Sequence, residues 1–264
     1  MGMPIMSFYS KYIKKNKRKF LSFVADLYSK QGAKNLKKNT ELLNTLTEYI
    51  KISDSTGCSF SDLWILYNYI KKNKPKEILE CGTGVSTIVM AHALMENEEQ
   101  YNQKGRITSM EDQEKWYKHA RIIMPDHLKP YIDLIHSEKV EYCYSIFRGI
   151  GYKNVPERPY EFVFIDGPET TAPSDGMTSF DFDYINVVIK SNNPVYGIID
   201  KRIGTSYVFQ KIFGVDKVRY DTKRDLCFIG PCTNKDIRTR ISTNSFLHSL
   251  RFVRKTKLNL HMLQ

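Results

Sequence analysis

The sequence predicts an α/β fold in which a mostly parallel sheet carries helices on both faces. Short runs rich in β-branched and aromatic residues alternate with helical stretches roughly every 25–35 residues between positions 77 and 200. Acidic residues end several of these runs, and two further runs near position 220 flank a polar turn. A chain of 264 residues with 41% hydrophobic content can bury a core of this kind without disulfides or metals.

The amino-terminal part is predicted to be helical. Apolar residues recur at three- and four-residue steps, as a helix with one buried face requires, in residues 8–28, 42–50 and 63–70. Ser59 or Ser61 is expected to cap the third of these helices. Residues 30–40 are polar and contain a glycine, so a linker is expected there.

The alternating part of the chain supplies the sheet and its covering helices. The predicted strands are Glu77–Glu80, Arg106–Met110, Ile132–His136, Phe162–Asp166 and Val195–Asp200. The predicted helices between them lie near Thr87–Glu98, Gln113–Ile123, Lys139–Phe147 and Phe180–Lys190. Lys217–Tyr220 and Leu226–Ile229 flank a polar turn and predict a hairpin, whose last strand runs antiparallel to the rest.

Positive charge is concentrated at the two ends of the chain. The net charge is +11, whereas residues 1–39 alone carry +9, residues 235–264 carry +6 and residues 40–234 carry −4. We therefore divide the chain into a basic amphipathic segment (1–39), a central domain (40–232) and a basic tail (233–264). A basic helix face can be merely solvated, or it can contact an anionic membrane, an acidic polysaccharide or nucleic acid.

The cysteines and the absence of long apolar runs favour the cytoplasm, with peripheral contact to a membrane as an extension of that expectation. The five cysteines are scattered and form no Cys-x-x-Cys pair, so neither a zinc site nor a disulfide framework is expected. No stretch reaches the roughly 18 consecutive apolar residues that span a bilayer, and lysines interrupt any amino-terminal signal sequence.

A glycine turn follows the first predicted strand in the sequence Glu80-Cys81-Gly82-Thr83-Gly84-Val85-Ser86. Glycines let the backbone turn tightly and let a ligand approach it closely. A carboxylate directly before the turn would repel a pyrophosphate, and the third glycine of dinucleotide-binding turns is missing. The turn therefore disfavours a nicotinamide oxidoreductase and favours a ligand that carries positive charge.

This turn resembles motif I of the Rossmann-like (class I) S-adenosylmethionine-dependent methyltransferases, and Ile165-Asp166-Gly167-Pro168 resembles their motif beside the transferable methyl group. The resemblance covers roughly residues 59–232 and implies S-adenosylmethionine as the cofactor. Glu111 would bind the ribose hydroxyls, with Asp112 as the alternative, and Ser137 would lie near the adenine. The implied cofactor-binding residues are Glu80, Gly82, Thr83, Gly84, Ser86, Glu111, Asp112, Ser137 and Asp166.

The resemblance also implies how an acceptor hydroxyl would be activated. A hydroxyl is a poor nucleophile and needs a general base or a cation to lower its pKa. Asp166 and Asp200 resemble the pair that holds Mg²⁺ in catechol-type O-methyltransferases, although Lys201 stands where those enzymes tend to place asparagine. In the alternative without a metal, Asp166 is the base and Lys201 or Arg202 steadies the acceptor.

A second, fainter resemblance concerns the acceptor. The segments around Asp166, Asp175 and Asp200 are similar in arrangement to sugar and polysaccharide O-methyltransferases, which implies a sugar hydroxyl in a glycan or glycoconjugate as the substrate. Residues 168–179 would then form a polar substrate loop. Two other functions stay open: an RNA methyltransferase whose basic ends follow phosphates, and a non-catalytic binding module with the same fold.

Overall fold

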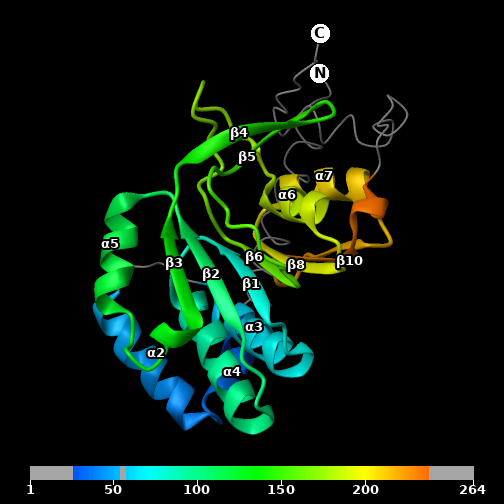
Figure 1. Cartoon of the computed structure of the whole chain (residues 1–264). Coiled ribbons are helices and arrows are strands. Elements are labelled where there is room, and N and C mark those ends of the chain that lie inside the picture. The colour runs from blue at the N-terminus through cyan, green and yellow to red at the C-terminus, as the bar shows by residue number, and fades with distance from the viewer. Residues whose placement is uncertain (1–25, 54–57, 238–264) are drawn as a thin grey trace, which may run out of the picture.

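The structure is a computed structural model that describes residues 26–53 and 58–237, and its centre is a seven-stranded sheet (Figure 1). The strand order is β3-β2-β1-β6-β8-β10-β9. All neighbouring pairs are parallel except those of β10, which runs antiparallel to both β8 and β9. The strands are β1 (Glu77–Cys81), β2 (Arg106–Glu111), β3 (Ile132–His136), β6 (Phe162–Ile165), β8 (Val195–Asp200), β9 (Val218–Asp221) and β10 (Leu226–Cys232). The predicted α/β fold and its closing hairpin are thereby confirmed.

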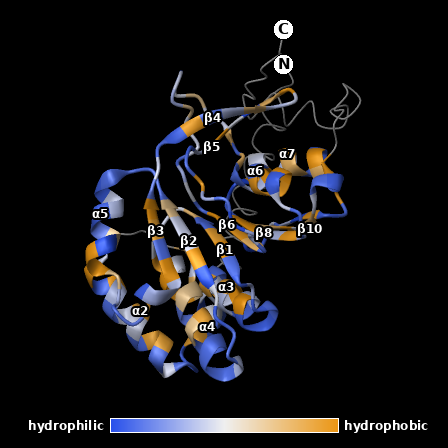
Figure 2. Ribbon diagram, viewed as in Figure 1, coloured by the Kyte–Doolittle hydropathy of each residue, from blue (hydrophilic) through white to orange (hydrophobic). Residues whose placement is uncertain are grey.

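Helices cover both faces of this sheet. One cluster of buried side chains joins α2 (Thr40–Ile52), α3 (Phe60–Asn73) and α4 (Val85–Tyr101) to one face, and a second joins α6 (Asp183–Lys190) and α7 (Ile203–Phe213) to the other. Ile78 belongs to the first cluster and Leu79 to the second, as the alternation of side chains along a strand requires. Figure 2 shows apolar residues along the strands and mixed helices around them. Helix α5 (Glu114–Ile123) lies beside β3 (Figure 1).

The expected linker at 30–40 is wrong for most of its length, because residues 26–36 are helical and Leu36 is buried. The glycine in this stretch serves close packing: a Cβ on Gly32 would lie 2.4 Å from the carbonyl oxygen of Phe60. Ser59 is the cap of α3, since its hydroxyl accepts a hydrogen bond from Asp62 N at 3.3 Å while the Asp62 carboxylate accepts one from Ser59 N at 3.0 Å.

The predicted helix near Lys139–Phe147 is also wrong, because these residues form most of a hairpin. Its strands are β4 (Lys139–Tyr144) and β5 (Phe147–Tyr152), and β7 (Phe180–Asp181) pairs with β5 to make a small second sheet. A Cβ on Gly149 would lie 2.3 Å from the Phe182 ring, so this glycine lets the hairpin approach the chain that enters α6. Two short 3₁₀ turns, Lys129–Tyr131 and Asn234–Asp236, complete the described elements.

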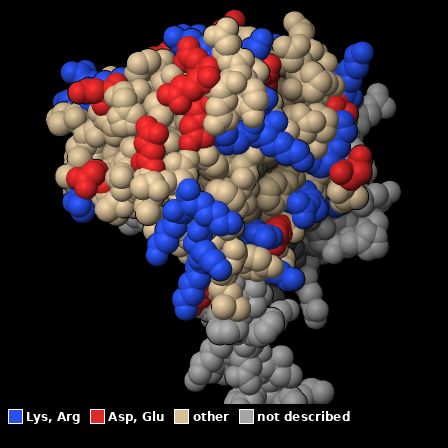
Figure 3. All heavy atoms as spheres, turned by 90° about the horizontal axis from the view of Figure 1, so that it is seen from below, with Lys and Arg blue, Asp and Glu red and all other residues tan. Residues whose placement is uncertain are grey.

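Most of the two basic ends lies outside the described residues, so the amphipathic helix expected at 8–28 and the basic tail stay predictions. Within residues 26–53 and 58–237, none of the helices combines the length and the apolar character needed to cross a bilayer. Figure 3 shows lysines and arginines beside aspartates and glutamates on the face turned to the viewer, so both charges occur there.

A buried carboxyl group ties the hairpin to the helical layer. Asp183 begins α6 and is fully buried, and its Oδ1 accepts a hydrogen bond at 3.0 Å from the backbone N–H of Tyr152 at the end of β5. Burial raises the pKa of Asp183 to about 8, since the charged form loses its hydration. At neutral pH this group is therefore mainly protonated in the folded chain.

The stability of the fold should depend on the proton of Asp183. An unfolded aspartate ionises near pH 4, so between about pH 4 and 8 the folded state binds the additional proton and the unfolding free energy falls as pH rises. Asp183→Asn mimics the protonated acid and should flatten this fall by at most about 1.4 kcal/mol per pH unit. Denaturant unfolding from pH 5 to 8 measures it. Asp216→Asn, at an exposed position, should keep the wild-type slope; equal slopes in all three proteins would contradict the assignment.

Candidate functional site

Two loops meet at the carboxyl ends of β1 and β6 through a glycine in each. Gly82 has φ +94°, in the left-handed region that favours glycine, and a Cβ there would lie 2.8 Å from Gly167 N. A Cβ on Gly167 would in turn lie 2.6 Å from Gly82 Cα. The backbone N–H groups of Asp166 and Gly167 both donate to the Cys81 carbonyl, at 2.9 and 2.6 Å. This contact fixes Asp166 beside the predicted glycine turn.

Glu80 lies behind the turn, at 0% exposure. Its carboxylate accepts hydrogen bonds from Ser86 at 2.6 Å and Thr87 at 2.6 Å on α4, and from Ser109 at 2.7 Å on β2. Burial raises the pKa of Glu80 to about 7, although these three donors counteract it. The side chain thus joins the first turn of α4 to two strands and does not line the cavity described next.

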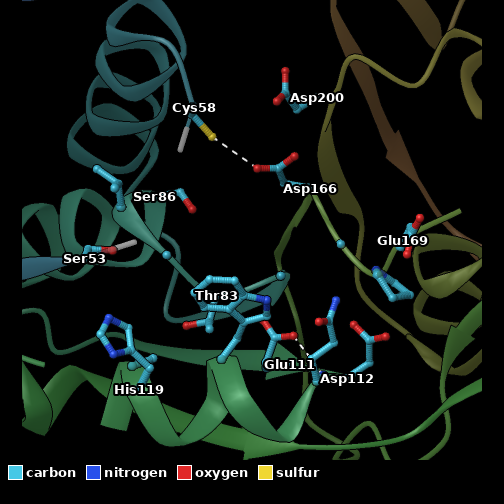
Figure 4. Close-up of a pocket in the computed structure, with 18 of the residues that line it drawn as sticks. Ser53, Cys58, Thr83, Ser86, Glu111, Asp112, His119, Asp166, Glu169 and Asp200 are labelled. Atoms are coloured by element: carbon cyan, nitrogen blue, oxygen red, sulfur yellow. Dashed lines mark hydrogen bonds between the residues drawn. The ribbon is translucent and has the colours of Figure 1, made fainter. Parts of the chain in front are cut away.

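A cavity of about 380 Å³ opens above the carboxyl ends of the parallel strands (Figure 4). The loops after β1, β2, β6 and β8 contribute to its wall, and the segment from α2 to α3 contributes Tyr49, Ser53 and Cys58. The predicted site residues that line it are Gly82, Thr83, Gly84, Ser86, Glu111, Asp112, Asp166, Asp200 and Lys201. Ligands of open α/β sheets bind at this edge.

Ser137 is the second predicted residue that lies outside the lining. It is buried, its hydroxyl accepts a hydrogen bond from Asn154 N at 3.0 Å, and its own N–H donates to the Glu111 carbonyl at 3.0 Å. It therefore ties the end of β3 to the residues that follow the β4–β5 hairpin.

Glu111 and Asp112 lie at the end of β2, where they face the glycine turn that follows β1, and both line the cavity. Glu111 is buried and one of its oxygens accepts a hydrogen bond from Gln113 N at 3.0 Å. Burial raises the pKa of Glu111 and outweighs that hydrogen bond. The group is thus held in one orientation beside Thr83, where it can accept further hydrogen bonds.

The residues of α5 that reach the cavity were not among the predicted ligands. Trp116 and His119 line it, and their rings meet edge to face with centroids 6.3 Å apart. His119 Nε2 is buried without a hydrogen-bond partner among the described residues. The spacing of three residues places both on one helix face, but a pattern of this kind does not separate a ligand-binding face from a core face.

Asp166, Asp200 and Cys58 lie at the other end of the cavity (Figure 4), and Lys201 also lines it. Asp200 is 2% exposed, and Lys201 Nζ donates to its Oδ2 at 3.0 Å. The Cys58 thiol donates to Asp166 Oδ2 at 3.5 Å. Loss of hydration inside the cavity, followed by the negative charge of Asp200, raises the pKa of Asp166 to about 6. The three predicted catalytic residues are thus brought together, with a thiol that the sequence did not single out.

Arg202 does not line the cavity and instead braces its wall. Its guanidinium donates to the backbone oxygens of Asp166 at 2.6 Å and Pro168 at 2.8 Å, and pairs with the buried carboxylate of Asp181. These contacts hold the loop after β6 in place. A direct contact between Arg202 and the acceptor is therefore not part of the observed arrangement.

Part of this chain is similar to a known protein family. Residues 79–192 match the model of a family described as a methyltransferase domain. No curated protein sequence matches the chain. Similar solved structures include the O-methyltransferase TomG of Streptomyces achromogenes with S-adenosylmethionine, 14% identical over 73% of this chain and 89% of that one, with a TM-score of 0.43. The methyltransferase PaMTH1 of Podospora anserina is also 14% identical, over 62% of this chain and 64% of that one, with a TM-score of 0.41.

We base the family on the matched segment, because identities and TM-scores this low describe only a related chain path. The match begins in β1, includes the glycine turn, Glu111 and Asp166, and ends after α6. It thus spans both of the motifs on which the expected family depended. Residues 79–192 match a methyltransferase domain, in agreement with the methyltransferase class that the two motifs predicted.

Proposed function

We propose that the chain transfers the methyl group of S-adenosylmethionine to a hydroxyl of a sugar, in a glycan or glycoconjugate. The observation that carries this proposal is the position of Asp166. Its carboxylate is exposed to the cavity at the point where the glycine turn meets Asp200 and Lys201. A base at this junction has the cofactor on one side and space for an acceptor on the other.

The charge of the lining favours a cationic cofactor. Among the described residues, Lys201 is the one lysine or arginine in the cavity lining, whereas five carboxylates line it. These belong to Glu111, Asp112, Asp166, Glu169 and Asp200. S-adenosylmethionine carries a sulfonium and an ammonium group, which such a surface attracts, while a pyrophosphate would be repelled. Glu111 offers a carboxylate to the ribose hydroxyls, and the exposed backbone of Gly82–Gly84 allows close approach.

Methyl transfer requires alignment and removal of one proton. The acceptor oxygen attacks the methyl carbon in line with the departing sulfur, so the protein mainly orients the two reactants. Asp166 accepts the hydroxyl proton in our proposal, and its raised pKa makes it a stronger base than an ordinary aspartate. Arg202 and the Cys81 carbonyl keep its backbone in place.

The donor atoms around Asp166 also suit a divalent cation. Asp200 Oδ1 is buried and has no hydrogen-bond partner among the described residues, and a second carboxylate lies beside it. Asp166 and Asp200 would hold the ion, and a bound ion would lower the pKa of an acceptor hydroxyl. Lys201 occupies the position expected for a third oxygen ligand and binds Asp200 Oδ2 instead.

The sugar acceptor is supported by the polar wall beyond Asp166. The segment after Pro168 is held against the hairpin, since Lys139 Nζ donates to the Glu169 carbonyl at 2.9 Å and Arg148 binds both Asp175 oxygens at 2.9 and 2.8 Å. This leaves the carboxylate of Glu169 on the cavity lining. The carboxylates at this end and Lys201 can satisfy the several hydroxyls of a sugar.

Cofactor binding should depend on Glu111. Replacing Glu111 by Gln removes a charged acceptor of two ribose hydrogen bonds, so the dissociation constant for S-adenosylmethionine should rise about 10–100-fold in isothermal titration. Glu138→Gln is the matched control, because Glu138 is exposed and does not line the cavity. Absence of wild-type binding at millimolar cofactor would refute the proposed function.

Turnover should follow the ionisation of Asp166. The base acts only when deprotonated, so in enzyme freed of metals with a chelator kcat/KM should rise from pH 5 to 7 and level off above the pKa of about 6. Asp166→Asn should lower kcat by at least about 100-fold, the usual worth of a general base, while cofactor affinity changes only a few-fold. Labelled cofactor and a panel of sugar acceptors provide the assay. Asp126→Asn, exposed and remote from the cavity, should keep the wild-type profile; full activity of Asp166→Asn would overturn the catalytic assignment.

A further inference from the structure

Three possible metal ligands converge at one end of the cavity from separate parts of the chain. Cys58 Sγ, one oxygen of Asp166 and one oxygen of Asp200 all lie within 4.8 Å of one another. Cys58 precedes the cap of α3, Asp166 follows β6, and Asp200 ends β8. Figure 4 shows the three side chains around a common space, with the thiol and the Asp166 carboxylate pointing toward each other.

The second observation is the unsatisfied oxygen of Asp200. Asp200 is only 2% exposed. Lys201 donates a hydrogen bond to its Oδ2, whereas its Oδ1 has no hydrogen-bond partner in the described part of the chain. Buried carboxylate oxygens are rarely left without a donor or a cation, because desolvation then goes uncompensated. The free oxygen belongs to the same group that completes the cluster with Asp166 and Cys58.

The electrostatic surroundings favour a cation there. Besides Asp166 and Asp200, the carboxyl group of Asp62 lies near the Cys58 thiol, and it is buried. In the structure the thiol donates a hydrogen bond to Asp166 Oδ2. A dication at this place would replace that proton with a stronger positive charge, since metal binding to cysteine releases the thiol proton to solvent.

We propose that Cys58, Asp166 and Asp200 bind a divalent cation of the borderline-soft class, with Zn²⁺ as the preferred ion. The inference rests on the proposed function and deepens it: with the ion bound, Asp166 is a ligand, and the ion would take over the activation of the acceptor hydroxyl, for which the fourth position is left. Catalytic zinc sites have this form, with three protein ligands and one open position. The thiolate distinguishes the site from an all-oxygen magnesium site, since soft ligands select zinc and hard oxygens select magnesium.

The geometry is close to what a shared ion needs. Typical Zn–S and Zn–O bonds in a tetrahedral site place sulfur and oxygen about 3.6 Å apart. Cys58 Sγ and Asp166 Oδ2 are already 3.5 Å apart. Asp200 has to approach by a side-chain adjustment within the 4.8 Å limit of the cluster. Lys201 stays bound to the other Asp200 oxygen and offsets part of the ligands' negative charge.

Cobalt(II) substitution tests the thiolate ligand directly. After removal of metals with a chelator, one equivalent of Co²⁺ added to the full chain should produce a thiolate-to-cobalt charge-transfer band in the near ultraviolet. Zn²⁺ should abolish the band at equal concentration, and Mg²⁺ should not. Cys58→Ser should lose the band and weaken Zn²⁺ binding by more than about tenfold. Cys143→Ser, which removes an exposed cysteine, should retain both.

A second measurement needs no variant. Bound Zn²⁺ should protect Cys58 from alkylation, followed by mass spectrometry, while the exposed Cys143 reacts equally with and without the metal. A wild-type chain that binds S-adenosylmethionine but shows neither the band nor the protection overturns the metal site and leaves the proposed function intact. A band without cofactor binding would support the metal site and refute the proposed function.

Discussion

The site depends on the close contact between two backbones, at Gly82 after β1 and Gly167 after β6. A side chain at either position would separate the loops, because its Cβ would lie under 3.0 Å from the opposite backbone. The same contact directs two backbone N–H groups to the Cys81 carbonyl and so fixes the backbone position of Asp166. Arg202 closes the arrangement from the far side by binding the backbone oxygens of Asp166 and Pro168. The cofactor half and the acceptor half of the cavity are therefore set by one rigid junction.

The sequence predicted the large sheet well because its strands are short apolar runs that end in polar residues. It failed at residues 139–147, although Val140, Tyr142, Tyr144 and Ile146 alternate with more polar residues, which is the period of a half-buried strand. The packing of the hairpin depends on tertiary contacts that the sequence does not show: Gly149 lets β5 pass against Phe182. The linker predicted at residues 30–40 failed for a similar reason. In a sequence, a glycine that permits close helix packing, such as Gly32, cannot be told from a linker glycine. Domain boundaries 1–39, 40–232 and 233–264 stay predictions.

Glu80 shows how a residue can be recognised without its role being recognised. Its place at the end of β1 was predicted, and so was its proximity to the glycine turn. Its partners Ser86, Thr87 and Ser109 come from two further elements, and only the packed structure reveals that they consume its hydrogen-bonding capacity. A buried carboxylate that accepts three hydroxyl hydrogen bonds stabilises the start of α4, and the cavity is lined by residues such as Glu111 instead.

Local sequence patterns did not indicate that Cys58 lies in the candidate site. Metal ligands are usually sought as closely spaced cysteines and histidines, and by that criterion the five scattered cysteines excluded zinc. Cys58 and Asp166 are instead 108 residues apart. Asp166 and Asp200 meet because parallel strands end at one sheet edge, and the segment before α3 brings Cys58 to them. A site assembled from loop ends can combine sulfur with carboxylates that no contiguous motif contains. In such a fold the ligands of an ion and the wall of the cofactor cavity are the same loops, so cofactor and ion would constrain each other's geometry.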